Sequence, residues 1–316
     1  MESKQRDAGA LPYGVVASSV TPFNQDGDPD ISRVHLHIDW LIEQGIAGIS
    51  PLGSSGEFPA LEYADRQRIV DASLEAVNGR VPTLMGTHHY TTKQTVALSK
   101  YAEGAGATAL LVIPPYYMVP SRTQVMDHYR AIAEAVQIPI MLYYNIANTN
   151  VRLHVDDLLQ LHAEGAISGV KWSDPAAAPL FDLIDGSDNA MRVYVGVDSV
   201  AFEGLSYGAH GWISGIPSIV PKAANALYQK LAVEHDLAAA RAEWRKLLPL
   251  VRFEFAGIMT GDDPHWFAVM KTTLNMLIGP EIGAPALPVQ PLPALDHARL
   301  AELLSAVGYP AAADGQ

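Results

Sequence analysis

Residues 138–171 of this 316-residue chain, IPIMLYYNIANTNVRLHVDDLLQLHAEGAISGVK, contain the unit that decides the fold. Two short apolar runs, 138–144 and 167–171, enclose an amphipathic stretch at 155–163. Apolar runs of this length, bounded by Gly, Pro or polar residues, are typical of strands buried on both faces. The unit therefore predicts two parallel strands joined by a helix.

The same alternation extends through most of the chain. Six more runs resemble these two in length and composition: 14–20, 47–52, 81–86, 109–113, 191–195 and 211–214. The stretches between the runs carry helix start and stop signals. The expected helices are 30–44, 62–77, 92–103, 121–136, 155–163, 179–185 and 199–208. Eight strands alternating with helices predict an α/β fold, the (β/α)8 TIM barrel.

The alternation stops near residue 221. Four helical stretches follow with no strand pattern between them: 221–234, 236–255, 266–278 and 295–307. We expect the first of these to close the barrel. The chain is therefore predicted to divide into a barrel that carries the active site, residues 1–233, and a C-terminal helical extension, residues 234–316.

Composition excludes several classes of function. Without cysteine, the chain has no disulfide framework, thiolate metal site or cysteine nucleophile. With 21 Lys plus Arg against 34 Asp plus Glu, the net charge of −13 disfavours nucleic acid and anionic lipid as partners. No apolar stretch approaches the ~20 residues that span a bilayer, and the first 14 residues lack the apolar core of a secretory signal. We expect a soluble cytoplasmic protein with a small-molecule substrate.

In such a barrel, function gathers at the carboxyl ends of the strands. Lys171 ends the sixth predicted strand, where burial favours a neutral amine that can attack a carbonyl carbon and form a Schiff base. Tyr144 ends the fifth predicted strand. It is interpreted either as a proton-transfer group beside the lysine or as an aromatic residue of the core. Residues 53–57, GSSGE, present amides and two hydroxyls that suit a carboxylate, with Glu57 expected to orient this loop. A lysine that merely snorkels at a strand end is the structural alternative for Lys171.

In combination, these residues resemble the dihydrodipicolinate synthase and N-acetylneuraminate lyase superfamily of pyruvate-dependent class I lyases. The resemblance extends from about residue 14 to residue 291, and the order and spacing of the matching stretches agree. These stretches are 20–23, 53–57, 115–117, 144–145, 169–171 and 208–214.

The resemblance implies a role for each matching residue. Lys171 would form the Schiff base with pyruvate or a related 2-oxo acid, and Tyr144 would transfer protons at that centre. Ser54 and Ser55 would hold the substrate carboxylate. Ser54 would also link Tyr144 to Tyr117 of a neighbouring subunit in a proton relay.

Further residues are implied to line the substrate pocket: Thr21, Gly53, Ser173, Gly196, Asp198 and Ser214. The resemblance also implies a homotetramer, built as a dimer of dimers. It implies no metal and no diffusible cofactor, because the Schiff base at Lys171 is itself the electron sink.

One departure bears on the substrate. After the fifth strand, the family's synthases carry a proline and an arginine, which are absent from residues 144–151, YNIANTNV. Arg152 lies close in sequence to the position of that arginine but is shifted from it. Ala147 replaces the proline, which the neuraminate lyases also keep. In the family's synthases, that arginine holds the carboxylate of the second substrate. Binding this carboxylate in a buried site without a charged partner costs free energy. We therefore expect an aldolase or dehydratase acting on a hydroxylated 2-oxo acid. The alternatives are an authentic 4-hydroxy-tetrahydrodipicolinate synthase, a barrel that binds 2-oxo acids without turnover, and a metal-assisted enolising barrel.

Two aromatic features are left open by the sequence. His88 and His89 follow the third strand, so one of them should face the pocket, as an acid–base group or as a structural residue. Trp172 either narrows the pocket beside Lys171 or packs behind the strand.

Overall fold

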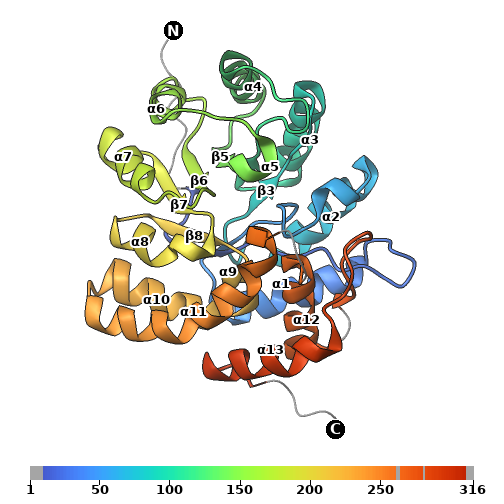
Figure 1. Ribbon diagram of the computed structural model, residues 1–316. Helices are drawn as coiled ribbons and strands as arrows, with labels where there is room; N and C mark the ends of the chain where they lie inside the picture. Colours follow the sequence, from blue (N-terminus) through green and yellow to red (C-terminus); the bar gives the residue numbers. More distant parts are fainter. Residues whose placement is uncertain (1–9, 261–263, 280–281, 311–316) are drawn as a thin grey trace.

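A computed structural model describes residues 10–260, 264–279 and 282–310 of the chain. Eight parallel strands form a ring surrounded by helices (Figure 1). They are β1 (Gly14–Ala17), β2 (Gly48–Ile49), β3 (Leu84–Gly86), β4 (Ala109–Val112), β5 (Ile140–Tyr144), β6 (Gly169–Trp172), β7 (Arg192–Val195) and β8 (Gly211–Ser214). Their order is β2-β1-β8-β7-β6-β5-β4-β3, and a bridge between Ile49 and Thr83 joins the two ends. The predicted TIM barrel is confirmed.

The helices that surround the ring lie within a few residues of the predicted ranges. They are α1 (Ile31–Glu43), α2 (Tyr63–Val77), α3 (Thr92–Ala105), α4 (Arg122–Ala135), α6 (Val155–Ala163), α7 (Ala178–Gly186), α8 (Ala201–Ser206) and α10 (Pro221–Tyr228). Two four-residue helices were not predicted: α5 (Ile146–Thr149) and α9 (Ile216–Ile219). Both follow a strand directly, so they lie at the strand ends where the candidate site is expected.

The strands are buried on both faces, and alternate residues serve different layers. Met141 and Tyr143 of β5 belong to the cluster that fills the barrel, whereas Leu142 and Tyr144 pack in the layer between strands and helices. This follows from the two-residue period of a strand. The register places Tyr143 beside Lys171 and Tyr144 beside Trp172 on β6.

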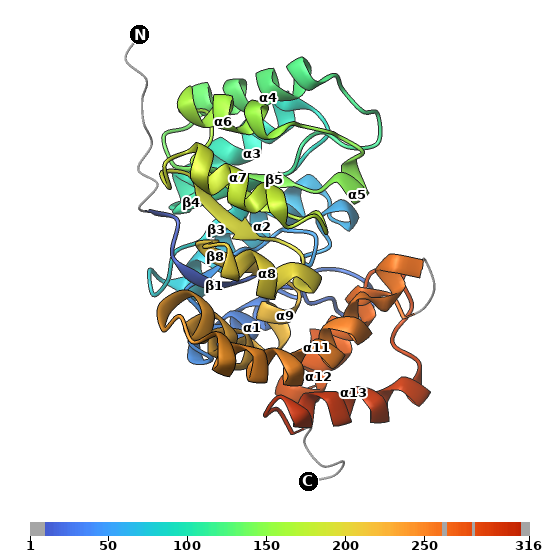
Figure 2. The same ribbon diagram turned by 60° about the vertical axis from the view of Figure 1, so that its left-hand side comes forward.

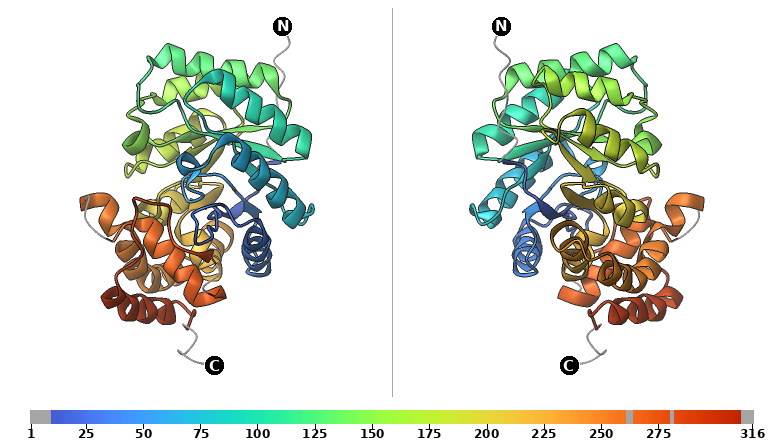
Figure 3. Two further views of the ribbon diagram at one scale, coloured as in Figure 1. Left: turned by 90° about the vertical axis from the view of Figure 1, so that its right-hand side faces the viewer. Right: turned by 90° about the vertical axis from the view of Figure 1, so that its left-hand side faces the viewer.

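Three helices follow the barrel: α11 (Leu237–Thr260), α12 (Trp266–Ile278) and α13 (Ala294–Ala306). They lie together on the side of the barrel that carries α9 and α10 (Figures 2 and 3). α11 also contacts the 3-10 turn η3 (Asp198–Val200), which follows β7. The division of the chain at residue 233 stays a prediction. None of the helices in the described ranges is long and apolar enough to cross a membrane.

A buried ion pair connects this helical extension to the loop at 53–57. Lys271 Nζ of α12 lies 2.8 Å from Glu57 Oε1, and both side chains are at most 3% exposed. The N–H of Ala286 donates to Glu57 Oε2 at 2.7 Å, and Lys271 donates to the carbonyl of Ala284 at 2.9 Å. Glu57 therefore orients the loop, as expected, through the part of the chain that follows the barrel.

Breaking this pair from one side should strongly destabilise the fold. Lys271→Met leaves Glu57 buried without its partner, so we expect a loss of about 3–5 kcal/mol in the free energy of unfolding, measured in urea. The double variant Glu57→Gln/Lys271→Met should recover most of that loss. Lys246→Met, which removes the exposed partner of Glu243, is the matched control and should cost under about 1 kcal/mol. An equal loss in the two lysine variants would contradict this role.

Candidate active site

Lys171 lies at the carboxyl end of β6, in a pocket of about 390 Å³. Its side chain is 3% exposed, and its Nζ lies 3.9 Å from the centre of the Tyr143 ring. Gly196, at the end of β7, makes room for the lysine stem, because a Cβ there would lie only 2.7 Å from Lys171 Cγ. Among the described residues that line this pocket, Lys171 is the cationic one.

The hydroxyl of Tyr143 is surrounded by polar groups. Asn145 Nδ2 donates to it at 3.0 Å, and Ser54 Oγ lies 3.3 Å away. Burial alone would raise the pKa of Tyr143, but the charge of Lys171 and hydrogen bonds with Ser54, Asn145 and Ser173 lower it below the ordinary value of 10. This phenol is therefore well suited to give and take a proton beside the Lys171 amine.

The prediction that Tyr144 lies beside Lys171 is wrong. The ring of Tyr144 stacks on Trp172, with centroids 4.3 Å apart, in the layer outside the barrel. The reason is the strand period, because Tyr144 is one residue beyond Tyr143 and points to the opposite face. Trp172 thus packs behind the strand, where its indole N–H donates to the carbonyl of Ala176 at 2.8 Å.

The loop at 53–57 brings two predicted hydroxyls to the pocket. Ser54 and Ser55 both line it. Gly53 does not, since its α-carbon faces Ser18. Thr21 was expected in the pocket but is buried beneath the loop, where its hydroxyl donates to the carbonyl of Gly56 at 2.7 Å. Thr21 therefore supports the loop and does not line the pocket.

The part of the pocket near the ends of β7 and β8 is acidic. Asp198 Oδ1 accepts from the indole N–H of Trp212 at 3.0 Å and from the hydroxyl of Ser214. Burial raises the pKa of Asp198 to about 6, although these hydrogen bonds oppose the shift. Ser173, Gly196, Asp198 and Ser214 all line the pocket, as predicted. The hydroxyl of Ser173 donates to the carbonyl of Gly196 at 2.7 Å, which fixes both residues beside Lys171.

Sequence reasoning missed Glu254, a pocket residue on α11. It is 2% exposed, and burial together with the charge of Asp198 raises its pKa well above the ordinary value. A signal was available, because Glu254 follows the buried Leu247, Leu250 and Val251 at helical spacing and so occupies a core-facing position. A carboxylate at such a position is rarely buried without a function or a partner.

Neither histidine of the expected pair lines the pocket. His88 is 1% exposed; its Nδ1 accepts the N–H of Ile113 at 2.9 Å, and its ring packs on Phe58 at 4.6 Å. Burial lowers the pKa of His88 well below its ordinary value, so this ring stays neutral. His89 accepts the N–H of Thr91 at 3.0 Å on the outside of the strand end. Both rings are held in place by contacts with the protein.

Tyr117 does not line the pocket of Lys171 in its own chain. Its side chain is 89% exposed, and its backbone has a φ of +73°, which is unusual for a residue with a side chain. The next two side chains, Met118 and Val119, are 63% and 51% exposed. The loop thus carries three neighbouring apolar side chains away from its own barrel.

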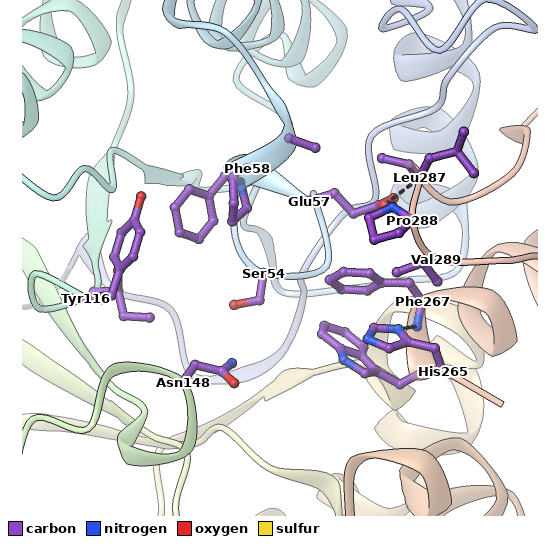
Figure 4. Close-up of a pocket in the computed structure, with 15 residues that line it drawn as sticks. Ser54, Glu57, Phe58, Tyr116, Asn148, His265, Phe267, Leu287, Pro288 and Val289 are labelled. Atoms are coloured by element: carbon purple, nitrogen blue, oxygen red, sulfur yellow. Dashed lines mark hydrogen bonds between the residues drawn. The ribbon is translucent and has the colours of Figure 1, made fainter. Parts of the chain in front are cut away.

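A second pocket of about 420 Å³ adjoins the first and shares Ser54 with it. In Figure 4, Ser54 lies between two groups of aromatic rings. Phe58 and Tyr116 form one group, and His265 and Phe267 belong to the other. The hydroxyl of Ser54 can therefore be approached from both pockets.

Comparison with known proteins places the chain in a family. The model of the dihydrodipicolinate synthetase family matches residues 11–306. The chain belongs to this family. Enzymes of the dihydrodipicolinate synthetase family are class I lyases that form a Schiff base with pyruvate, so this protein is a pyruvate-dependent lyase of that type.

Relatives of known name and structure agree with this assignment. A 4-hydroxy-tetrahydrodipicolinate synthase of Nitrosospira multiformis is 34% identical over 93% of this chain and 95% of its own length. A putative dihydrodipicolinate synthetase from Pseudomonas aeruginosa, 33% identical, superposes with a TM-score of 0.87 over 93% of this chain and 99% of its own. A prophage protein of the family from E. coli K12, solved in complex with pyruvate, is 28% identical with a TM-score of 0.84, over 94% and 99% of the two chains.

The two adjacent tyrosines should differ sharply in their effect. Tyr143→Phe removes the hydroxyl beside Lys171, so we expect a loss of about 100-fold or more in deuterium exchange at the pyruvate methyl group, followed by proton NMR. Tyr144→Phe, the matched control, leaves the stacked ring in place and should stay within about threefold of the parent. The reverse order of effects would contradict the strand register described above.

Proposed function

We propose that Lys171 forms the Schiff base and that the reaction is the cleavage or dehydration of a hydroxylated 2-oxo acid. The observation that carries this proposal is the grouping of the Lys171 amine, the Tyr143 hydroxyl and the Ser54 hydroxyl in one pocket. A barrel that only binds 2-oxo acids has no use for a proton-transfer group beside an amine. The same grouping uses no metal ligand, which disfavours the metal-assisted alternative.

The chemistry would proceed from these atoms. The neutral amine of Lys171 attacks the C2 carbonyl carbon, and water leaves as the C=N bond of the iminium forms. Tyr143 passes protons to and from the intermediates. In a cleavage, loss of the C4 hydroxyl proton breaks the C3–C4 bond, releases C4 as an aldehyde and leaves an enamine. Protonation of the enamine at C3 gives the iminium of pyruvate. In a dehydration, loss of a C3 proton is followed by departure of the C4 hydroxyl as water. Hydrolysis of the iminium frees Lys171.

The carboxylate of the 2-oxo acid would lie at Ser54 and Ser55. Their hydroxyls and the amides of this glycine-flanked loop can hold an anion without a cation. The iminium charge on Lys171 adds to this attraction locally, although the net charge of the protein is −13.

The rest of the pocket favours a hydroxylated substrate over aspartate semialdehyde. Arg152, the basic residue nearest to the missing arginine, is exposed and lies beside Tyr144, outside the pocket. Asp198 and Glu254 both line this pocket, and its described lining has no cationic side chain besides Lys171. The curated relatives named 4-hydroxy-tetrahydrodipicolinate synthase support the alternative, that this protein is itself such a synthase.

We further propose that Tyr117 serves the site of a second copy in a homotetramer built as a dimer of dimers. Its exposure and its left-handed backbone suit a side chain that enters another subunit. The aromatic pocket beside Ser54 is large enough to receive a tyrosine ring. In the assembled protein, Ser54 would then connect Tyr143 of one copy with Tyr117 of the other.

Trapping with borohydride tests the Schiff base. Incubation with pyruvate and borohydride should leave one reduced pyruvate on Lys171, found by peptide mass spectrometry. Lys171→Ala should form no adduct, whereas Lys100→Ala, at an exposed lysine, should be trapped like the parent. If no 2-oxo acid leaves an adduct, or if the adduct lies on another lysine, the proposal fails.

Mixing inactive variants tests the contribution of Tyr117. Lys171→Ala and Tyr117→Phe should each exchange pyruvate protons slowly. Random exchange of subunits should restore roughly a quarter of the parent rate, because half of the pairs then hold one complete site. Lys171→Ala mixed with Tyr143→Phe is the control and should restore nothing, since Lys171 and Tyr143 belong to one chain. Full exchange by Tyr117→Phe alone would exclude a role for this hydroxyl.

A substrate panel separates the reactions. Condensation of pyruvate with aspartate semialdehyde would identify a synthase. Pyruvate release from a hydroxylated 2-oxo acid, coupled to lactate dehydrogenase, would identify an aldolase. A direct assay of the 2-oxo acid would detect a dehydratase. We expect the synthase assay to be the weakest of the three, and a dominant synthase activity would contradict our choice.

A further inference from the structure

Glu254 enters the pocket from outside the barrel. It belongs to α11, which packs on the 3-10 turn that begins with Asp198. The position where a Cβ on Gly215 would lie is 3.3 Å from Glu254 Cδ and 3.5 Å from Asp198 Oδ2. The two carboxyl groups therefore approach the same point above the end of β8. A residue larger than glycine at position 215 would fill the space into which Glu254 projects.

Asp198 and Glu254 differ in how their oxygens are used. Asp198 accepts hydrogen bonds from Trp212 and Ser214, so its carboxylate is held in one orientation. Glu254 Oε2 is buried and has no hydrogen-bond partner within the described part of the chain. Leaving a buried carboxyl oxygen unpaired is costly, unless a bound molecule supplies the partner. The free oxygen of Glu254 therefore points to a ligand group that completes the site.

The chemistry of that ligand group follows from the charges around it. The pocket's described lining offers no cation besides Lys171, which the proposed function engages at the opposite end of the substrate. A second carboxylate would meet the charge of Asp198 in a site shielded from water, where repulsion is strong. A hydroxyl group can donate to Asp198 and also bond Glu254, so it satisfies both.

We propose that Glu254, together with Asp198, recognises the far end of the 2-oxo acid, admitting substrates that end in a hydroxyl group and rejecting those that end in a carboxylate. This inference rests on the proposed function and adds a substrate class to it. It assigns a specificity role to the helical extension, which also contributes Phe255 and Trp266 to the lining of the pocket. Burial and the charge of Asp198 raise the pKa of Glu254, which favours the protonated carboxyl, the form that can donate a hydrogen bond.

The test compares two acids that differ only at that end. The probes are 2-oxo-3-deoxygluconate, which ends in a hydroxymethyl group, and its counterpart with a C6 carboxylate. Each is titrated against the protein with borohydride, and the half-saturating concentration for adduct formation on Lys171 is read by mass spectrometry. We expect the parent to prefer the hydroxymethyl acid by about 10-fold or more, the scale of one well-placed hydrogen bond.

Variants of Glu254 should alter this preference. Glu254→Leu keeps the volume without the polar group, and should lower the preference by about 10-fold. Glu254→Gln keeps a neutral donor and should hold the hydroxymethyl acid within about threefold of the parent. Glu243→Ala, which lies on the same helix outside this pocket, is the matched control and should match the parent.

Each outcome bears on a different claim. A parent that prefers the carboxylate acid, or a preference that Glu254→Leu leaves unchanged, would overturn the role of Glu254 while Lys171 is still trapped. A parent that forms no adduct with either acid or with pyruvate would overturn the proposed function itself. Because Glu254→Leu replaces a buried carboxyl with an apolar group of similar size, we expect it to fold, and Glu254→Gln provides a second folded variant.

Discussion

The parallel pairing of β5 with β6 is the constraint on which the candidate site depends. It sets Tyr143 beside Lys171 inside the barrel, and Tyr144 beside Trp172 outside it. A shift of one residue in either strand would turn its side chains to the opposite face and separate the Tyr143 hydroxyl from Lys171. Because β5 and β6 lie inside a closed ring with neighbours on both sides, such a shift would disturb every strand next to them. The hydrogen bonds that build the barrel therefore also hold Tyr143 and Lys171 next to each other.

The helical extension contributes to the site from the opposite direction. Lys271 of α12 holds Glu57, and with it the loop that carries Ser54 and Ser55. Glu254 of α11 enters the pocket next to Asp198, above Gly215 at the end of β8. We therefore propose that the barrel supplies the reacting groups, and that the extension orients the loop at 53–57 and selects the substrate. This arrangement explains why charged residues are buried in helices that would otherwise need only apolar packing.

The fold was predictable because its signals are repeated and long. Eight apolar runs with helices between them leave few architectures, and capping residues such as Ser121 marked where helices begin. The four-residue helices α5 and α9 were not predictable in this way, because they are too short to show a period. Lys171, Ser54 and Asp198 were found because strand ends define the mouth of a barrel.

The errors at the site have specific physical causes. The sequence pattern does not show which of Tyr143 and Tyr144 points into the barrel. A strand buried on both faces is apolar throughout, so its hydrophobicity does not distinguish inward from outward residues. Thr21 follows the first strand at the expected edge of the barrel, but its hydroxyl donates to the backbone carbonyl of Gly56. Tertiary packing alone determines this contact. Glu254 lies 83 residues after Lys171, on a helix that the barrel pattern does not include.

A crystal structure of the protein reduced with borohydride in the presence of pyruvate would show which lysine and which tyrosine contact the substrate. We expect continuous density from Lys171 Nζ to the pyruvate C2, with the carboxylate at Ser54 and Ser55 and the Tyr143 hydroxyl at the reacting carbon. Tyr144 should remain stacked on Trp172. An adduct on another lysine, or Tyr144 turned into the pocket in place of Tyr143, would contradict the account.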